Sequence, residues 1–198
     1  MPKKTKAAHK LDAFTEEQIR ASAVGELQQF PDNIPIADYD PRWPELFRRE
    51  AERVRFVLGP RALRIEHTGS TSVPGLAAKP IIDMLLVVAD PADEDAYLPD
   101  LTGAGYVLRI REPDWFEHRM FKGPGTDVNL HVFSSACAEI DRVLVFRDWL
   151  RNHPEDRDLY ERTKLALARK KWKYVQNYAD AKTGVIEDIL GRALRERA

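Results

Sequence analysis

IEHTGSTSVPGLAAKPIIDMLLVV, residues 65–88, is the stretch that decides the fold we expect for this chain. Residues 62–67 predict a short strand, and residues 68–79, rich in glycine, serine and threonine, predict a turn. The apolar run of residues 81–89 predicts a buried central strand that carries one charge, Asp83. Two strands joined by a small-residue turn, with one carboxylate between them, are therefore the starting point.

The turn offers the groups that bind an anion. Gly69 lets a backbone approach a ligand closely, and Thr68, Ser70, Thr71 and Ser72 supply hydroxyl and main-chain N–H groups. A helix beginning near residue 72 would add the attraction of its N-terminal dipole. The same composition also suits an ordinary turn or helix cap, and this alternative stays open.

Asp83 stands alone inside an apolar strand, where a carboxylate is costly unless it is paired, hydrogen-bonded or bound to a cation. Strand alternation places Lys79 and Asp83 on the same face. An ion pair with Lys79 is the structural interpretation, and a ligand or cation site is the functional one.

The remaining chain predicts an α+β protein: a small mixed sheet packed by helices on one side, with a helical C-terminal subdomain from about residue 140. Thr15 and Gln18 have capping-box spacing, which predicts a helix over residues 15–24. Further helices are expected at 41–58, 91–103, 140–152, 154 to the mid-170s and 179–195, and strands at 106–111, 119–122 and 127–133. Residues 1–14 are expected to form a disordered basic tail before a single domain of residues 15–198.

Composition excludes several classes of protein. The chain has 198 residues, 43% hydrophobic, with 31 basic and 32 acidic side chains and a net charge of −1. This balance gives no strong signal for nucleic acid, and no apolar run approaches the ~18 residues of a membrane span. One cysteine excludes a disulfide framework. We therefore expect a soluble, cytoplasmic domain, of an oligomeric state that the sequence leaves open.

Four separated motifs together resemble the GrpB family, which has the nucleotidyltransferase fold. They are DYDPRWP at 38–44, HTGSTSVPGLAAKPIID at 67–83, LHV at 130–132 and FRDWLR at 146–151. Tyr160 and Lys164 also match the family's spacing, so the resemblance covers roughly residues 15–190. Members of this family occur alone and fused to dephospho-CoA kinases.

The resemblance implies a role for each part of the site. In the wider superfamily a Gly-Ser turn, here Gly69-Ser70, holds a triphosphate, and carboxylates on one strand face hold two Mg²⁺ ions. Asp83 matches the first carboxylate, whereas Leu85 occupies the position of the second. The strand near His131 should supply the third group.

We accordingly expect Asp83 and His131 as the catalytic pair and as ligands of one divalent cation, Mg²⁺ or Mn²⁺ before Zn²⁺. Residues 69–72 with Lys79 and Arg119 are expected to bind the phosphates of a nucleotide or a phosphorylated small molecule. Arg119 could equally be a solvated edge residue, and His131 a structural histidine.

Two functions follow. One is a nucleotidyltransferase that moves a nucleotide from an NTP to an acceptor through a reduced metal site. The other is a catalytically degenerate nucleotide- or phosphate-binding or regulatory domain, which Leu85 favours.

Overall fold

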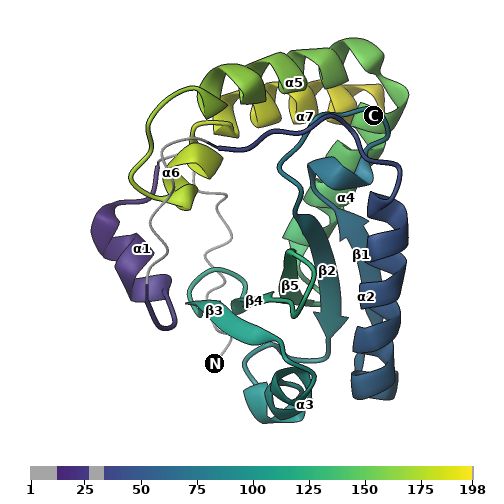
Figure 1. Cartoon of the computed structure of the whole chain (residues 1–198), viewed down its shortest axis with the longest axis vertical. Helices are drawn as coiled ribbons and strands as arrows, with labels where there is room; N and C mark the ends of the chain where they lie inside the picture. Colours follow the sequence, from purple (N-terminus) through teal and green to yellow (C-terminus); the bar gives the residue numbers. More distant parts are fainter. Residues whose placement is uncertain (1–12, 27–33, 198) are drawn as a thin grey trace.

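The computed structural model describes residues 13–26 and 34–197 as a five-stranded mixed sheet with helices on both faces (Figure 1). The strands are β1 (Arg64–Thr68), β2 (Ile82–Val88), β3 (Val107–Glu112), β4 (His118–Lys122) and β5 (Val128–Ser134). The helices are α1 (Glu16–Ser22), α2 (Trp43–Leu58), α3 (Leu98–Gly103), α4 (Ala138–Asn152), α5 (Pro154–Ala168), α6 (Val175–Asp180) and α7 (Thr183–Glu196). Short 3₁₀ turns lie at η1 (Gly59–Arg61), η2 (Ser70–Ser72) and η3 (Glu94–Ala96).

The strand order β1-β2-β5-β4-β3 places β2 inside the sheet, as its apolar sequence predicts. β2 pairs antiparallel with β1 and parallel with β5, and the other neighbours are antiparallel. The register sets Asp83 beside Asn129 and Leu85 beside His131. Alternation therefore brings these four side chains to one face of the sheet.

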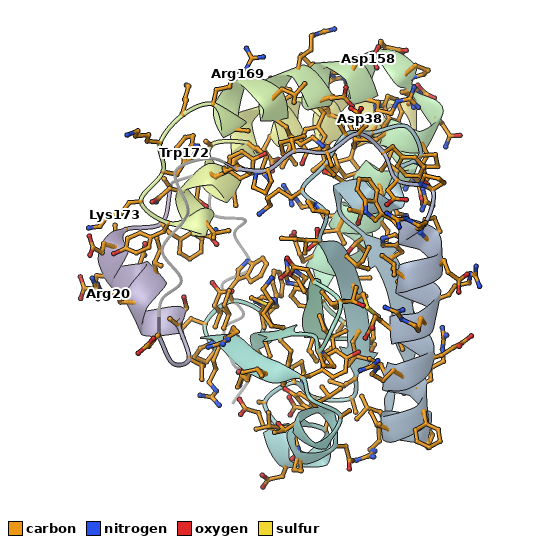
Figure 2. All side chains as sticks on the ribbon, in the orientation of Figure 1. Arg20, Asp38, Asp158, Arg169, Trp172 and Lys173 are labelled. Carbon is orange, nitrogen blue, oxygen red and sulfur yellow. The ribbon has the colours of Figure 1, made fainter. Side chains whose placement is uncertain are left out.

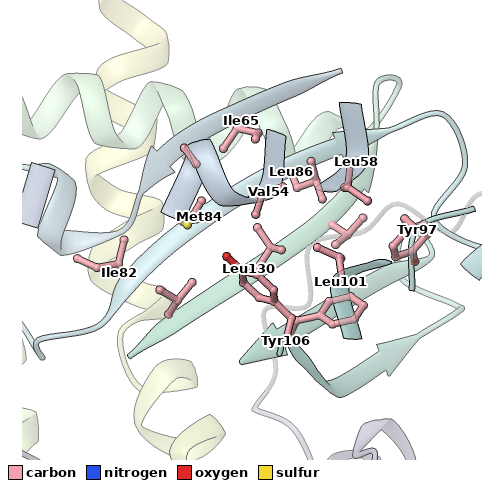
Figure 3. Packing of buried hydrophobic residues seen from close by; sticks show 14 of the residues in the cluster. Val54, Leu58, Ile65, Ile82, Met84, Leu86, Tyr97, Leu101, Tyr106 and Leu130 are labelled. Atoms are coloured by element: carbon pink, nitrogen blue, oxygen red, sulfur yellow. The ribbon is translucent and has the colours of Figure 1, made fainter. Parts of the chain in front are cut away.

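The opposite face carries the main hydrophobic core, which α2 and α3 cover (Figure 3). Met84 and Leu86 of β2 and Leu130 of β5 pack there against Val54 and Leu58 of α2. All five side chains are almost fully buried. Each such side chain contributes about 1.5–3 kcal/mol relative to exposure, so this layer supplies much of the stability of the sheet.

A second hydrophobic layer corrects the prediction that helices cover one side alone. Leu85 and Val87 of β2 and Phe133 of β5 pack on Ile140 and Leu144 of α4. Because β2 is apolar on both faces, it needs a cover on each. The prediction of an α+β mixed sheet with a helical C-terminal part is confirmed.

Two predicted helices are shorter than expected. The helix expected over 91–103 is η3 followed by α3, which starts beside Pro99, a residue suited to a first helical turn. The helix expected from residue 154 to the mid-170s ends at Ala168. The indole N–H of Trp172 donates to the Leu167 carbonyl at 2.8 Å, and Tyr174 then caps α6.

Helix α1 has the predicted capping box at Thr15. It lies beside the loop before α6, which carries Trp172 and Lys173 (Figure 2). Glu16 accepts hydrogen bonds there from Lys173 and Tyr174. The backbone N–H of Phe14 donates to Asp180 at 2.8 Å. Most of the tail predicted over residues 1–14 lies outside the described residues.

Candidate functional site

The turn after β1 rests directly on Asp83. Thr68, the last residue of β1, pairs with Asp83, and Gly69 follows with φ +65° and ψ −174°. A Cβ added at Gly69 would lie 2.2 Å from Asp83 Oδ2. This backbone conformation is essentially restricted to glycine, and the absent side chain leaves the room that the carboxylate fills. The predicted close approach at Gly69 is therefore to Asp83 within the chain.

The hydroxyls of Thr71 and Ser72 make hydrogen bonds within the protein. Both side chains are buried and donate to backbone carbonyls at 3.0 and 2.6 Å. His67 Nε2 lies 3.1 Å from Thr71 Oγ1, which makes His67 an interior hydrogen-bonded residue. These contacts correct the prediction that the Thr71 and Ser72 side chains bind phosphate: they build the turn.

Ser70 is the half-buried hydroxyl of this turn, and it hydrogen-bonds with Tyr160 of α5. Burial raises the pKa of Tyr160 to about 12, so the phenol is neutral. A cavity of about 140 Å³ opens beside the turn between α4, α5 and α7, and Gly69, Ser70, Phe146 and Tyr160 are among its lining residues. Ser70 therefore connects the turn to a small cavity with largely apolar walls.

Asp83 and His131 meet at the centre of the site. Asp83 Oδ1 accepts a hydrogen bond from Asn129 at 2.8 Å and lies 4.0 Å from His131 Nε2. Their side chains are 30% and 33% exposed. Burial raises the pKa of Asp83, while the Asn129 hydrogen bond and nearby lysines oppose the shift. Burial, then His118 and Lys122, lowers the pKa of His131 to about 3, so this imidazole is neutral.

Lysines surround the Asp83 carboxylate. Nζ of Lys79 and Nζ of Lys182 lie 5.7 and 4.6 Å from the centre of the same ring, Tyr178. Both ammonium groups, with Lys122 of β4, interact electrostatically with Asp83. Burial and the neighbouring Lys182 lower the pKa of Lys79 to about 8. Positive charge gathered in this way favours an anionic ligand.

Arg119 lies on the wrong face of the sheet for the predicted role. It pairs with Val132 in the β4–β5 register, on the side of the main core, while His131 points to the other side. Arg119 is 4% exposed, and its Nε donates to Glu94 at 2.6 Å. The prediction that it binds phosphate is wrong, because strand alternation turns it away and Glu94 satisfies its charge.

The resemblance implies a divalent cation at Asp83 and His131, and the residues present do not fit one. They supply one carboxylate and one imidazole, and Leu85 stands where a second carboxylate is needed. Glu66 lies across from Leu85, but two arginines bind it at 2.9 and 3.0 Å. Within the described part of the chain, no three His, Cys, Asp or Glu side chains are grouped as metal ligands. Mg²⁺ requires more oxygen ligands than this, so no step below passes through a metal.

Three residues that the structure places at the site were not predicted from the sequence. Lys182 precedes α7, about 100 positions after Asp83, and nothing in its local sequence marks it. His118 and Glu112 form the end of the β3–β4 hairpin, where His118 Nε2 lies 3.0 Å from His131 Nδ1. The sequence signal for this pair is their spacing, because residues on either side of a short hairpin turn are brought opposite each other.

The sequence matches the family model described as GrpB protein over residues 33–192, and the chain therefore belongs to the GrpB family. It is 61% identical over 179 residues to a UPF0157 protein of Halalkalibacterium halodurans, covering 90% of this chain and 92% of that protein. A UPF0157 protein of Streptomyces coelicolor is 47% identical over 160 residues, or 81% and 84% of the two chains. The crystal structure of conserved protein GrpB from Enterococcus faecalis superposes with a TM-score of 0.72 at 33% identity, covering 82% of this chain and 99% of that one.

A dephospho-CoA kinase of Mycolicibacterium paratuberculosis also matches, at 28% identity over 81% of this chain but 46% of the kinase. This agrees with the expected fusion of the family to such kinases. None of the described helices combines the length and apolar composition that crossing a bilayer requires.

Proposed function

We propose that this protein binds the phosphates of a nucleotide between the Gly69-Ser70 turn and the lysines around Asp83, and that it transfers the nucleotide to a small acceptor. The observation that carries the proposal is that Lys79 and Lys182 lie over one tyrosine ring and both interact electrostatically with Asp83, the carboxylate that the turn covers. Ammonium groups bind phosphate oxygens as point charges.

Transfer requires a group that takes the proton of the acceptor. The oxygen of the acceptor hydroxyl attacks the α-phosphorus, the bond to pyrophosphate breaks, and the hydroxyl proton moves to Nε2 of His131. The Asp83 carboxylate, 4.0 Å from that nitrogen, stabilises the positive charge that the ring acquires when it takes up this proton. The lysines stabilise the charge that develops on the phosphates.

The alternative is a binding or regulatory domain that uses the same pocket without chemistry. Leu85 favours it, because the position of a second carboxylate is apolar and buried. Both functions need the same phosphate contacts, so binding and turnover must be measured separately.

Binding is tested by thermal shift with NTPs, dNTPs, coenzyme A and dephospho-CoA, each with Mg²⁺, Mn²⁺ or EDTA. A ligand at 100 times its Kd adds about 2.7 kcal/mol, or roughly 5–10 °C for a domain of this size. We expect a shift that persists in EDTA, weakens in Ser70→Ala and is lost in Lys182→Gln. Lys170→Gln, which changes an exposed lysine outside the site, is the matched control and keeps the shift.

Turnover then separates the two functions. Nucleotide transfer that Asp83→Asn abolishes, with the fold and binding intact, supports the transferase. Binding without transfer in the wild type supports the regulatory domain. A panel without any shift contradicts both, and a shift that needs a divalent cation contradicts the metal-free site.

A further inference from the structure

A hydrogen-bonded chain of three side chains runs from the β3–β4 hairpin into the site. Glu112 Oε2 lies 2.7 Å from His118 Nδ1, and His118 Nε2 lies 3.0 Å from His131 Nδ1. The other nitrogen of His131, Nε2, faces Asp83 Oδ1 at 4.0 Å. The chain therefore begins at a carboxylate outside the phosphate site and ends at the atom to which we assign the proton acceptor.

Packing fixes the orientation of the middle residue. The His118 side chain is 4% exposed. Its ring stacks on Phe133, with centroids 4.7 Å apart and an interplanar angle of 21°, and lies nearly parallel to the ring of His131, with centroids 5.2 Å apart and an angle of 14°. Trp115 closes the edge of the same ring at 5.2 Å. A ring enclosed on three sides cannot flip its two nitrogens without repacking these neighbours.

The hairpin itself holds Glu112 against His118. The two residues form the last pair of the β3–β4 register. The turn that joins them places Phe116 and Glu117 at φ +53°, a conformation that is strained for residues other than glycine. Strain of this kind persists only where the surrounding contacts maintain it, and it is found most often at functional sites.

This hydrogen-bonded chain of side chains determines where the protons lie. An ionised carboxylate only accepts hydrogen bonds, so His118 carries its proton on Nδ1. When His118 carries this proton alone, its Nε2 accepts, and His131 donates from Nδ1. His131 is thereby held as the Nδ1–H tautomer, with the lone pair of Nε2 pointing at the site.

We propose that Glu112 and His118 are positioning residues that make His131 a proton acceptor and take up the charge it acquires; this rests on the proposed function. When Nε2 of His131 accepts a proton from the acceptor hydroxyl, the Nδ1 proton moves to Nε2 of His118. His131 ends neutral in its other tautomer, and the positive charge rests on His118 beside the Glu112 carboxylate.

This transfer moves charge away from a place that disfavours it. His131 is flanked by Asp83, Lys122 and His118, and burial, then His118 and Lys122, oppose an imidazolium there. At His118 the Glu112 carboxylate lies 2.7 Å away, where it stabilises a cation. His118 thus allows the neutral His131 to act as a base without remaining an imidazolium.

The test is a tautomer measurement by NMR on protein labelled with ¹⁵N at histidine, at neutral pH. In the wild type we expect His131 to show a pyrrole-like, protonated Nδ1 and a pyridine-like, unprotonated Nε2. A protonated Nε2 on His131 would overturn the proposal, whatever the variants do.

Two variants test the cause. His118→Phe keeps the aromatic stack but removes the acceptor, and Glu112→Gln removes the charge that fixes His118. In each we expect the single wild-type tautomer of His131 to give way to a mixture, and an unchanged tautomer in a folded variant would overturn the proposal. Glu117→Gln is the matched control, because it makes the same change in the same hairpin, where the carboxylate lies 3.9 Å from Arg119 instead.

An ATP titration of the same samples separates this inference from the proposed function. The predicted tautomer without ATP binding upholds the hydrogen-bonded chain and refutes the nucleotide site. ATP binding together with a protonated Nε2 on His131 upholds the nucleotide site and refutes the role of the hydrogen-bonded chain.

Discussion

Gly69→Ala tests the contact between the turn and Asp83 most sharply, because Gly75 offers a matched control. Both glycines have positive φ, +65° and +77°. The added methyl at Gly69 would lie 2.2 Å from Asp83 Oδ2 and 2.9 Å from its Cβ, whereas at Gly75 nothing lies within 4 Å. Both substitutions therefore carry a backbone penalty for positive φ, and only the one at Gly69 adds a collision.

The expected magnitudes follow from these two terms. A positive φ costs alanine about 1–2 kcal/mol, which is the whole effect expected for Gly75→Ala. Overpacking adds about 1–3 kcal/mol at Gly69, so Gly69→Ala should cost about 2–5 kcal/mol. At roughly 2–4 °C for each kcal/mol, the melting temperatures of the two variants should differ by about 2–12 °C.

Thermal melts and guanidinium unfolding measure these free energies, and thermal shift with ATP measures the site. We expect Gly69→Ala to lose the ATP shift and Gly75→Ala to keep it. Equal stability of the two variants would refute the packing of the turn on Asp83. Equal ATP shifts in two folded variants would refute the role of that turn in binding.

Three further predictions concern single residues. Burial lowers the pKa of His67 to about 4. Below pH 6.5 the unfolded chain therefore binds a proton at His67 that the native state does not bind. The free energy of unfolding should fall by about 3 kcal/mol between pH 6.5 and 4. Guanidinium unfolding at several pH values checks this, and an equal loss in His67→Phe would contradict it. Arg119→Gln should cost about 3–5 kcal/mol by breaking a buried ion pair yet leave the Kd for ATP unchanged; a weaker Kd would restore Arg119 to the site. Thr15→Ala should cost α1 about 1 kcal/mol and speed amide exchange in residues 16–22 about 5-fold, whereas unchanged exchange would show that the cap is dispensable.

The central part of the fold follows from local sequence. The apolar run around Asp83 predicts an interior strand, and Thr15 with Gln18 predicts the cap of α1, because both signals lie within a few residues. The end of α5 does not follow, because it depends on an indole hydrogen bond from Trp172 that periodicity does not reveal.

The site divides in the same way. Gly69 and Asp83 can be paired from sequence because one turn joins their strands. Lys182 cannot, because only tertiary packing brings the segment between α6 and α7 close enough to interact electrostatically with Asp83. The prediction for Arg119 is wrong because one residue of register in β4 decides which face of the sheet its side chain occupies, and local sequence does not fix that register.

A crystal structure of the wild-type protein with a non-hydrolysable ATP analogue, grown with EDTA, tests the central claim most directly. The account predicts density for the phosphates between Ser70 and the ammonium groups of Lys79 and Lys182, with the α-phosphate on the Asp83 and His131 side. Phosphates bound elsewhere on the molecule, or bound here only when a divalent cation is restored, would contradict it.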